Sequence, residues 1–202
     1  MHWVLGLGNP GKKYARTRHN AGFRVVDCLS RRWKCPLSSF DARCRWGVTA
    51  FGNVKVVLAQ PVTFMNASGE AARLLRDRLG LELGRLLVVC DDIDLPLGRL
   101  RLRAFGGSGG HNGLASVAME MDTDHFARLR VGIGRPPEGM DAADYVLSDV
   151  RPEEEQTMDR AVALAADAVE AVLRESLNAA MTEFNGLFVD NDGSHDAEPG
   201  GC

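Results

Sequence analysis

Two histidines and one carboxylate are the residues of this sequence best placed to do chemistry. His19 and His111 are each followed by an asparagine, and each stands in a loop after a segment that we expect to be a strand. Asp91 directly follows residues 86–90, an apolar run with the length and composition of a buried strand. A histidine with a carboxylate partner takes a proton from water or a hydroxyl near neutral pH. The pattern predicts such a pair, with Asp91 as the best partner by position.

Direct attack by water is the reaction that these residues favour. The sequence contains no Gly-x-Ser-x-Gly motif, which would place a nucleophilic serine on a sharp turn. Cys90 lies within the apolar run before Asp91, where a thiol usually packs in the core. No residue pattern therefore argues for a covalent intermediate.

The segment that follows Asp91 indicates binding of a polyanion. Arg99, Arg101 and Arg103 alternate with leucines, so a strand would place all three on one face. Residues 106–113 are too rich in glycine for a helix or strand interior, and they suit close backbone approach and exposed amide donors. An acid, a cationic stripe and an amide-rich loop so close together predict a site for a polyanion with a reactive bond. The alternative is an edge hairpin with a flexible loop.

Charge is distributed unevenly along the chain. Residues 1–148 contain 21 lysines and arginines against 14 acids, whereas residues 149–202 contain 3 against 13. A protein that binds nucleic acid would place a basic face on the first part and keep the acidic part away from it. The acidic part is also explained by a solvated helix followed by a tail.

Hydrophobic periodicity predicts strands that alternate with helices, which must position these side chains. Strands are expected at residues 3–8, 44–51, 54–59, 86–90, 99–103 and 129–133. Helices are expected at residues 21–34, 68–79 and 114–121, followed by a long helix that starts at Pro152 and a shorter one that ends near Phe184. This order predicts an α/β fold, a single domain with a mixed twisted sheet flanked by helices.

Length and composition predict one domain and a short tail. The domain is expected to span residues 1–190, and residues 191–202 form an acidic segment with little to bury, predicted to be disordered. No apolar run approaches the ~20 residues that span a bilayer, and we find no secretory signal. Five cysteines without a Cys-x-x-Cys pair indicate free thiols in a reducing compartment and argue against zinc. We therefore expect a cytoplasmic protein without membrane attachment.

The first strand ends in a glycine pattern that matches a dinucleotide-binding fingerprint only weakly. Gly6, Gly8 and Gly11 satisfy Gly-x-Gly-x-x-Gly, but the fingerprint requires its third glycine to open a helix. Residues 12–20 are polar and basic, with no apolar periodicity before Ala21. An enzyme with a nucleotide cofactor is therefore an alternative that the sequence disfavours.

Four motifs stand out in the chain by their order and spacing. They are G-L-G-N-P-G-x-x-Y-x-x-T-R-H-N-x-G (residues 6–22), Q-P-x-T-F-M-N-x-S-G (60–69), D-D-I-D-L-P-x-G (91–98) and G-S-G-G-H-N-G-L (107–114), with R-L-R-V-G-I-G-R-P (128–136) beside them. Together they resemble the motifs of bacterial-type peptidyl-tRNA hydrolases, and the resemblance covers about residues 2–185. It implies a single α/β domain, normally monomeric, without metal or cofactor. It further implies that the enzyme hydrolyses the ester joining a peptide to the 3′-terminal ribose of tRNA, which recycles tRNA from stalled translation.

The resemblance also implies roles for individual residues. His19 matches the general base for the attacking water, and Asp91, not Asp92, matches the carboxylate that steadies it. Asn9 matches the residue that distinguishes blocked from free aminoacyl ends. Substrate contacts at the peptide and the terminal nucleotide are matched by Tyr14, Phe64, Asn66 and Asn112, and basic positions near the tRNA phosphates by Arg101 and Arg103.

One rival function comes from the same fold. A chloroplast group II intron splicing factor resembles these hydrolases but binds RNA without cleaving it. Such a binder needs no general base, so the intact His19, Asp91 and three asparagines argue against that alternative. Release of peptide from peptidyl-tRNA is the observation that separates the two functions.

Overall fold

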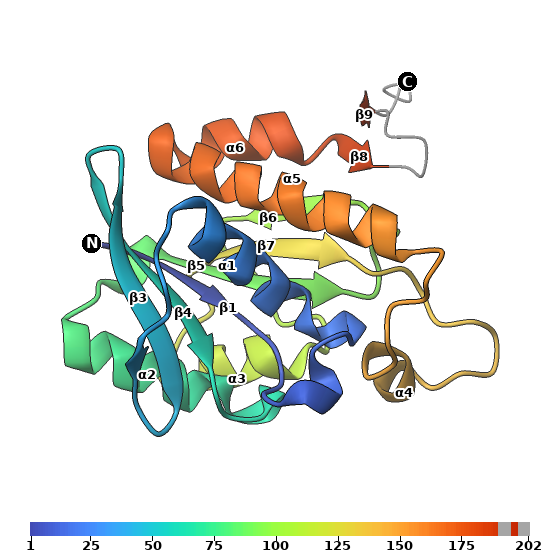
Figure 1. Ribbon diagram of the computed structural model, residues 1–202, viewed down its shortest axis with the longest axis horizontal. Helices are drawn as coiled ribbons and strands as arrows, with labels where there is room; N and C mark the ends of the chain where they lie inside the picture. The colour runs from blue at the N-terminus through green and yellow to red at the C-terminus, as the bar shows by residue number, and fades with distance from the viewer. Residues whose placement is uncertain (190–194, 198–202) are drawn as a thin grey trace.

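A seven-stranded mixed sheet forms the centre of the protein (Figure 1). The computed structural model describes residues 1–189 and 195–197. The strand order is β2-β3-β4-β1-β5-β7-β6, in which β4, β1, β5 and β7 run parallel and β2, β3 and β6 run antiparallel to their neighbours. The strands are β1 (His2–Gly6), β2 (Ser39–Phe40), β3 (Cys44–Phe51), β4 (Val54–Pro61), β5 (Leu86–Asp92), β6 (Leu100–Arg103) and β7 (Ala127–Gly132).

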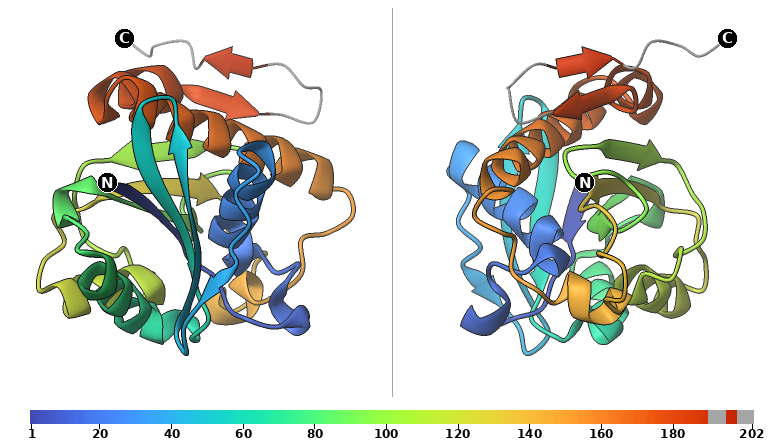
Figure 2. Two further views of the ribbon diagram at one scale, coloured as in Figure 1. Left: turned by 60° about the vertical axis from the view of Figure 1, so that its left-hand side comes forward. Right: turned by 90° about the vertical axis from the view of Figure 1, so that its right-hand side faces the viewer.

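Helices cover both faces of the sheet (Figures 1 and 2). One face carries α1 (Ala21–Arg32), α5 (Glu155–Arg174) and α6 (Leu177–Phe184), and the other carries α2 (Ser68–Leu79) and α3 (Asn112–Met121). Side chains of β1 point alternately to the two faces of the sheet, so Val4 packs in the core on the first face while Trp3 and Leu5 pack in the core on the second. The remaining helical segments are α4 (Ala142–Val146) and the 3₁₀ turns η1 (Lys12–Tyr14), η2 (Arg18–Asn20), η3 (Met65–Ala67) and η4 (Leu83–Arg85).

Most predicted elements are confirmed, and the differences concern short ones. The structure confirms the fold class, and α2 spans the predicted residues 68–79. The first turn that we expected at Pro152 is not helical, since α5 begins at Glu155. The two-residue β2 and the five-residue α4 were not predicted, because segments that short show no hydrophobic period.

The strand order brings the predicted site residues to one crevice. The chain leaves β1 over one face as α1 and leaves β4 over the other face as α2, so the connections diverge at the carboxyl ends of neighbouring strands. Open α/β sheets bind their ligands at such a switch point. His19 lies in the loop after β1, Asp91 lies near the end of β5, and Phe64 and Asn66 follow β4.

Glycines in the loop after β1 allow α1 to begin close against the sheet. A Cβ atom on Gly6 would lie 2.3 Å from the carbonyl oxygen of Gly22, and one on Gly22 would lie 2.3 Å from that of Val89. A Cβ on Gly8 would meet the ring of Phe23 at 2.6 Å. The first two glycines of the G-x-G-x-x-G pattern therefore serve helix packing, and the ring of Phe23 occupies the space beside Gly8. This packing argues against the nucleotide-cofactor alternative.

The C-terminal part of the chain continues past α6 into a small hairpin. In it, β8 (Leu187–Val189) pairs antiparallel with β9 (His195–Ala197). The predicted disordered tail, residues 191–202, lies mostly outside the described residues, so that expectation stays a prediction. Among the described residues, no helix combines the length and apolar character needed to cross a membrane.

Candidate active site

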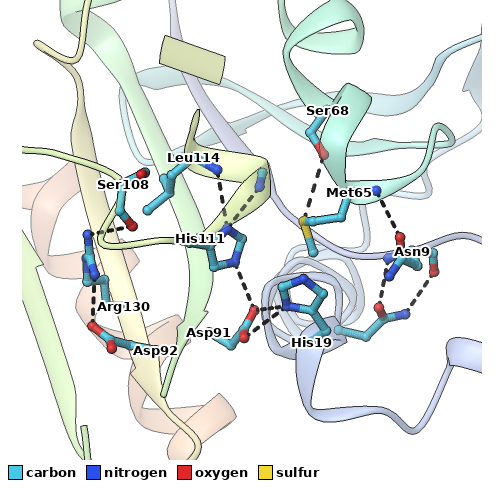
Figure 3. A network of polar contacts seen from close by, with 12 residues as sticks. Asn9, His19, Met65, Ser68, Asp91, Asp92, Ser108, His111, Leu114 and Arg130 are labelled. Carbon is cyan, nitrogen blue, oxygen red and sulfur yellow. Dashed lines mark hydrogen bonds and ion pairs between the residues drawn. The ribbon is translucent and has the colours of Figure 1, made fainter. Parts of the chain in front are cut away.

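His19 and Asp91 form the buried pair that the sequence predicts. The Nδ1 atom of His19 lies 2.8 Å and 3.0 Å from the two carboxylate oxygens of Asp91 (Figure 3). Both side chains are buried, with 9% and 3% of their surfaces exposed. Because an ionised carboxylate only accepts hydrogen bonds, Nδ1 carries the proton. The Nε2 atom is then the unprotonated, basic nitrogen, and within the described part of the chain no group bonds to it.

His111 contacts the same carboxylate but has neither ring nitrogen free. Its Nε2 lies 3.0 Å from Asp91 Oδ1, and its Nδ1 accepts from the backbone N–H groups of Gly113 and Leu114 (Figure 3). The latter bonds cap α3 and fix the ring as a donor to Asp91. The sequence offered both histidines as bases, and this geometry leaves only His19 with an available nitrogen.

The two histidines hold Asp91 in its ionised form. Burial alone raises the pKa of this carboxyl, but the charges of His111 and His19 and the hydrogen bonds from both rings outweigh it and bring the pKa well below its usual range. Asp92 has a different partner, since its Oδ2 lies 3.0 Å from Arg130 Nη1. The structure thus brings Asp91, and not its neighbour, to the histidine.

Asn9 is fixed in one orientation. Its Oδ1 accepts from the backbone N–H of Met65 at 2.8 Å, and its backbone exchanges two hydrogen bonds with the side chain of Asn20 (Figure 3). Since Oδ1 is occupied by a donor, the Nδ2 amide is the free end, and no described residue accepts from it. Asn9 therefore offers a fixed hydrogen-bond donor beside His19.

A cavity of about 600 Å³ opens over these groups. Tyr14 does not line the cavity but packs edge-on against Phe64, with ring centroids 6.4 Å apart. The walls of the cavity include α4, through Ala142, Ala143 and Val146, and the glycine-rich loop before α3. The predicted site residues that line it are Asn9, His19, Phe64, Asn66, Asp91 and Asn112.

A buried cation ties the histidine loop to the wall formed by α4. The guanidinium of Arg18 lies 4.4 Å from the ring centroid of Tyr145 on α4 and forms an ion pair with Glu154. Burial raises the pKa of Glu154, but hydrogen bonds from Arg151 and Arg18 outweigh it and lower the pKa to about 2. No sequence pattern predicts this contact, because its partners are more than 120 positions apart.

The predicted arginine strand is confirmed for Arg101 and Arg103, which form a cationic surface at the edge of the sheet. Arg101 and Arg103 are exposed on β6, and the antiparallel register places them opposite Arg130 and Arg128 of β7. These four arginines line a hollow of about 310 Å³ that shares Asp92 and Arg130 with the cavity over His19. Arg99 precedes the strand and forms an isolated bridge to Phe188. The residues of β7 escaped prediction because cross-strand register is not visible in the sequence.

Two other chemistries find weak support at the site. His19, Asp91 and His111 are the one group of potential metal ligands among the described residues, with ligand atoms within 4.8 Å of one another. Those atoms already face one another in hydrogen bonds, and a metal would occupy the nitrogens that hold Asp91. Burial raises the pKa of the Cys90 thiol, with the neighbouring charge of Asp91 adding to the effect, so this cysteine is not a nucleophile at neutral pH.

Known proteins share this sequence and this architecture. The model of the peptidyl-tRNA hydrolase family matches residues 3–192. The peptidyl-tRNA hydrolase of Chloroflexus aggregans is 47% identical over 93% of this chain and all of that protein, and the one of Geobacillus kaustophilus is 44% identical over 92% of this chain and all of that protein. The crystal structure of peptidyl-tRNA hydrolase from Acinetobacter baumannii is 33% identical and covers 92% of this chain and 94% of that chain, with a TM-score of 0.85. The chain therefore belongs to the peptidyl-tRNA hydrolase family and is an enzyme that releases the peptide from peptidyl-tRNA.

Proposed function

We propose that the enzyme cleaves the ester at the 3′-terminal ribose of tRNA by direct attack of a water that His19 deprotonates. One observation carries this proposal: His19 lines the cavity, is held through Nδ1 by an ionised carboxylate, and has an Nε2 atom that no described residue bonds. As the water oxygen attacks the ester carbon, its proton moves to Nε2 and the carbonyl oxygen becomes negative. Collapse of this intermediate breaks the bond to the ribose oxygen, which takes the proton from the imidazolium.

Asp91 acts through His19, and His111 in turn positions Asp91. Its negative charge stabilises the imidazolium that forms on His19, and the hydrogen bond to Nδ1 keeps the reactive tautomer in place. His111 donates to the same carboxylate and prevents it from turning away. His111 is therefore a positioning residue in this mechanism.

Asn9 gives the enzyme its preference for blocked substrates in this proposal. Its free Nδ2 amide donates to a carbonyl oxygen, and the carbonyl of the peptide group next to the ester exists only when the amino acid is N-blocked. A free aminoacyl group instead brings an ammonium, which would lose water in the cavity. A site that hydrogen-bonds a substrate group discriminates strongly against the analogue that lacks it.

The remaining residues bind the two ends of the substrate. Phe64, Asn66 and Asn112 contact the peptide and the terminal nucleotide, and Tyr14 supports the ring of Phe64. Arg101 and Arg103 bind tRNA phosphates, because both are exposed and no carboxylate of the described residues pairs with them.

The proposal extends to the working state of the enzyme. It acts as a monomer in the cytoplasm, where its substrate arises in translation, and without metal, cofactor or membrane. Treatment with EDTA should leave turnover unchanged, whereas loss of turnover that zinc restores would assign a metal to His19, Asp91 and His111.

The catalytic unit comprises residues 1–190, so deletion of residues 191–202 should leave turnover and melting temperature near those of the intact chain.

Peptide release from N-acetyl-aminoacyl-tRNA tests the proposed mechanism. His19→Ala should lower the rate of peptide release by ~10²–10⁴-fold, because a general base typically contributes a factor of that order. His2→Ala is a matched control, since His2 starts β1 and lies at the opposite end of that strand from the site. Wild-type turnover in His19→Ala would remove His19 from the mechanism. No cleavage by the unaltered enzyme would favour the RNA-binding alternative.

A further inference from the structure

An exposed aromatic ring stands in the cationic hollow on β6 and β7. Phe105 follows β6, is 63% exposed, and lines the hollow together with Arg101 and Arg103. Burying a phenylalanine ring stabilises a protein, so exposure of this ring forgoes a gain in stability. Neither core packing nor the hydrolytic mechanism accounts for Phe105 at this position.

The ring of Phe105 has one supported face and one open face. It stacks on the imidazole of His125, with ring centroids 5.5 Å apart and an interplanar angle of 27°. His125 comes from the loop between α3 and β7 and is itself exposed. Because His125 covers one face of the ring and Phe105 remains mostly exposed, the opposite face is accessible to a planar group.

A buried arginine fixes both segments that carry these rings. Arg128 donates to the carbonyl oxygens of Gly106 and Gly107, next to Phe105. The same guanidinium donates at 2.6 Å to the carbonyl oxygen of Asp124, the residue before His125. The spacing between the two rings is therefore set by a side chain that is 1% exposed, which makes the pair a preformed element.

The hollow adjoins the place where the ester is cleaved. Arg130 and Asp92 line both the hollow and the catalytic cavity, and Figure 3 shows Arg130 bonded between Asp92 and Ser108 of the glycine-rich loop. RNA that enters the hollow therefore lies next to the cavity in which the proposed mechanism places the 3′-terminal ribose. Cationic grooves with exposed aromatic side chains bind nucleic acid by pairing phosphates with arginines and stacking bases on rings.

We propose that Phe105, supported by His125, is a stacking platform for a nucleobase at the acceptor end of the tRNA. Arg101 and Arg103 bind the flanking phosphates, so this inference rests on the proposed role of the hollow in tRNA binding. Stacking on a ring does not read a base by hydrogen bonds, so the platform serves tRNAs of different sequence. Its contribution to affinity is largely independent of salt, unlike that of the two arginines.

Binding of deacylated tRNA over a salt series tests the platform without cleavage. Phe105→Ala and Phe105→Leu should each raise the Kd for tRNA about tenfold, because one base stack contributes a factor of that order. Phe105→Trp should keep the wild-type Kd, because its ring can still stack on a base. The slope of log Kd against log salt should stay at the wild-type value in all three variants. Phe40→Ala is the matched control, since Phe40 is 68% exposed but lies on β2, at the opposite edge of the sheet.

The results separate stacking on Phe105 from tRNA binding by the arginines of the hollow. Wild-type affinity in Phe105→Ala or in Phe105→Leu would overturn the stacking proposal. If Arg103→Ala flattens the salt slope at the same time, tRNA binding in the hollow stands without the platform. With tRNA trimmed of its single-stranded 3′ end, a persisting loss in Phe105→Ala assigns the platform to the terminal base pair. Disappearance of the loss assigns it to an unpaired base.

Discussion

The cavity over His19 and the cationic hollow are neighbours built in opposite ways. In the cavity, His19 and Asp91 are buried and His111 is partly buried, and hydrogen bonds at 2.8–3.0 Å join them. In the hollow, Arg101 and Arg103 are exposed and have no carboxylate partner among the described residues. Proton transfer requires a fixed geometry, whereas attraction of a polyanion requires free charge. The difference predicts that changes in the cavity alter the rate of cleavage and that changes in the hollow alter the affinity for tRNA.

The largest effect within the cavity, apart from loss of the base itself, is expected for Asp91→Asn. The carboxylate accepts from two histidines, and an amide offers only one acceptor oxygen together with a donor that opposes a ring N–H. We expect a loss of ~10–100-fold in turnover, as for other partners that orient a functional histidine, with the Kd for tRNA unchanged. Measurement of turnover and of the Kd for tRNA checks this expectation. A variant that loses affinity but keeps its turnover would contradict the separation of cleavage in the cavity from tRNA binding in the hollow.

Asn9→Ala should narrow the preference for blocked substrates. The variant lacks the Nδ2 donor, so N-acetyl-aminoacyl-tRNA loses a hydrogen bond that free aminoacyl-tRNA never formed. We expect the ratio of kcat/KM for the two substrates to fall about tenfold, a factor typical of one hydrogen bond. Asn9→Asp is an informative companion, since it keeps the acceptor for Met65 but removes the donor. An unchanged ratio in both variants would show that Asn9 does not read the peptide group.

Replacing Arg101 and Arg103 with alanine should weaken the binding of all tRNAs to a similar extent. Each lost phosphate contact should flatten the slope of log K against log salt by ~0.9 for duplex and ~0.7 for single-stranded RNA. Arg135→Ala is a control of equal charge, since Arg135 is exposed but already paired with Asp94. Slopes that remain at the wild-type value in the double variant would show that the phosphates lie elsewhere.

The smallest effect concerns stability and the contact between Arg18 and Glu154. The pKa of Glu154 in the folded chain is about 2, below its ordinary value of 4.5, so the carboxylate stabilises the fold above pH ~4.5, and this contribution is lost as the pH falls toward 2. Glu154→Gln should therefore lower the melting temperature at pH 7 by a few degrees, and the difference from wild type should shrink below pH 4.5. Thermal unfolding scans of both proteins between pH 3 and 7 measure this difference in melting temperature. A difference that grows at low pH would contradict a stabilising role for the ionised Glu154.

Sequence patterns predicted the elements well and the contacts between them less well. Residues 68–79 form a helix and Asp91 lies at the carboxyl end of a buried strand as expected, because both features follow from local periodicity. The choice between His19 and His111 was not available from the residues alone, since it depends on the N–H groups of Gly113 and Leu114. The resemblance named His19 for that role, and the hydrogen bonds give a physical reason for it.

The sequence predicted only part of the hollow, because the rest depends on contacts between distant segments. The alternation of arginines along 99–103 marks one strand, but Arg128 and Arg130 join that surface only through the pairing of β6 with β7. The small wall of the cavity formed by α4 was missed, because five residues are too few to show a helical period. Contacts between distant segments are thus where sequence patterns give the least information.

Single-turnover cleavage, measured together with tRNA affinity, tests the division between cavity and hollow most directly. With enzyme in saturating excess over N-acetyl-aminoacyl-tRNA, His19→Ala should cleave at least ~10²-fold more slowly than wild type while its Kd stays the same. The double variant Arg101→Ala/Arg103→Ala should do the reverse, with a raised Kd and a wild-type rate once the substrate is bound. A slow rate in the arginine variant at saturation, or a full rate in His19→Ala, would contradict the account.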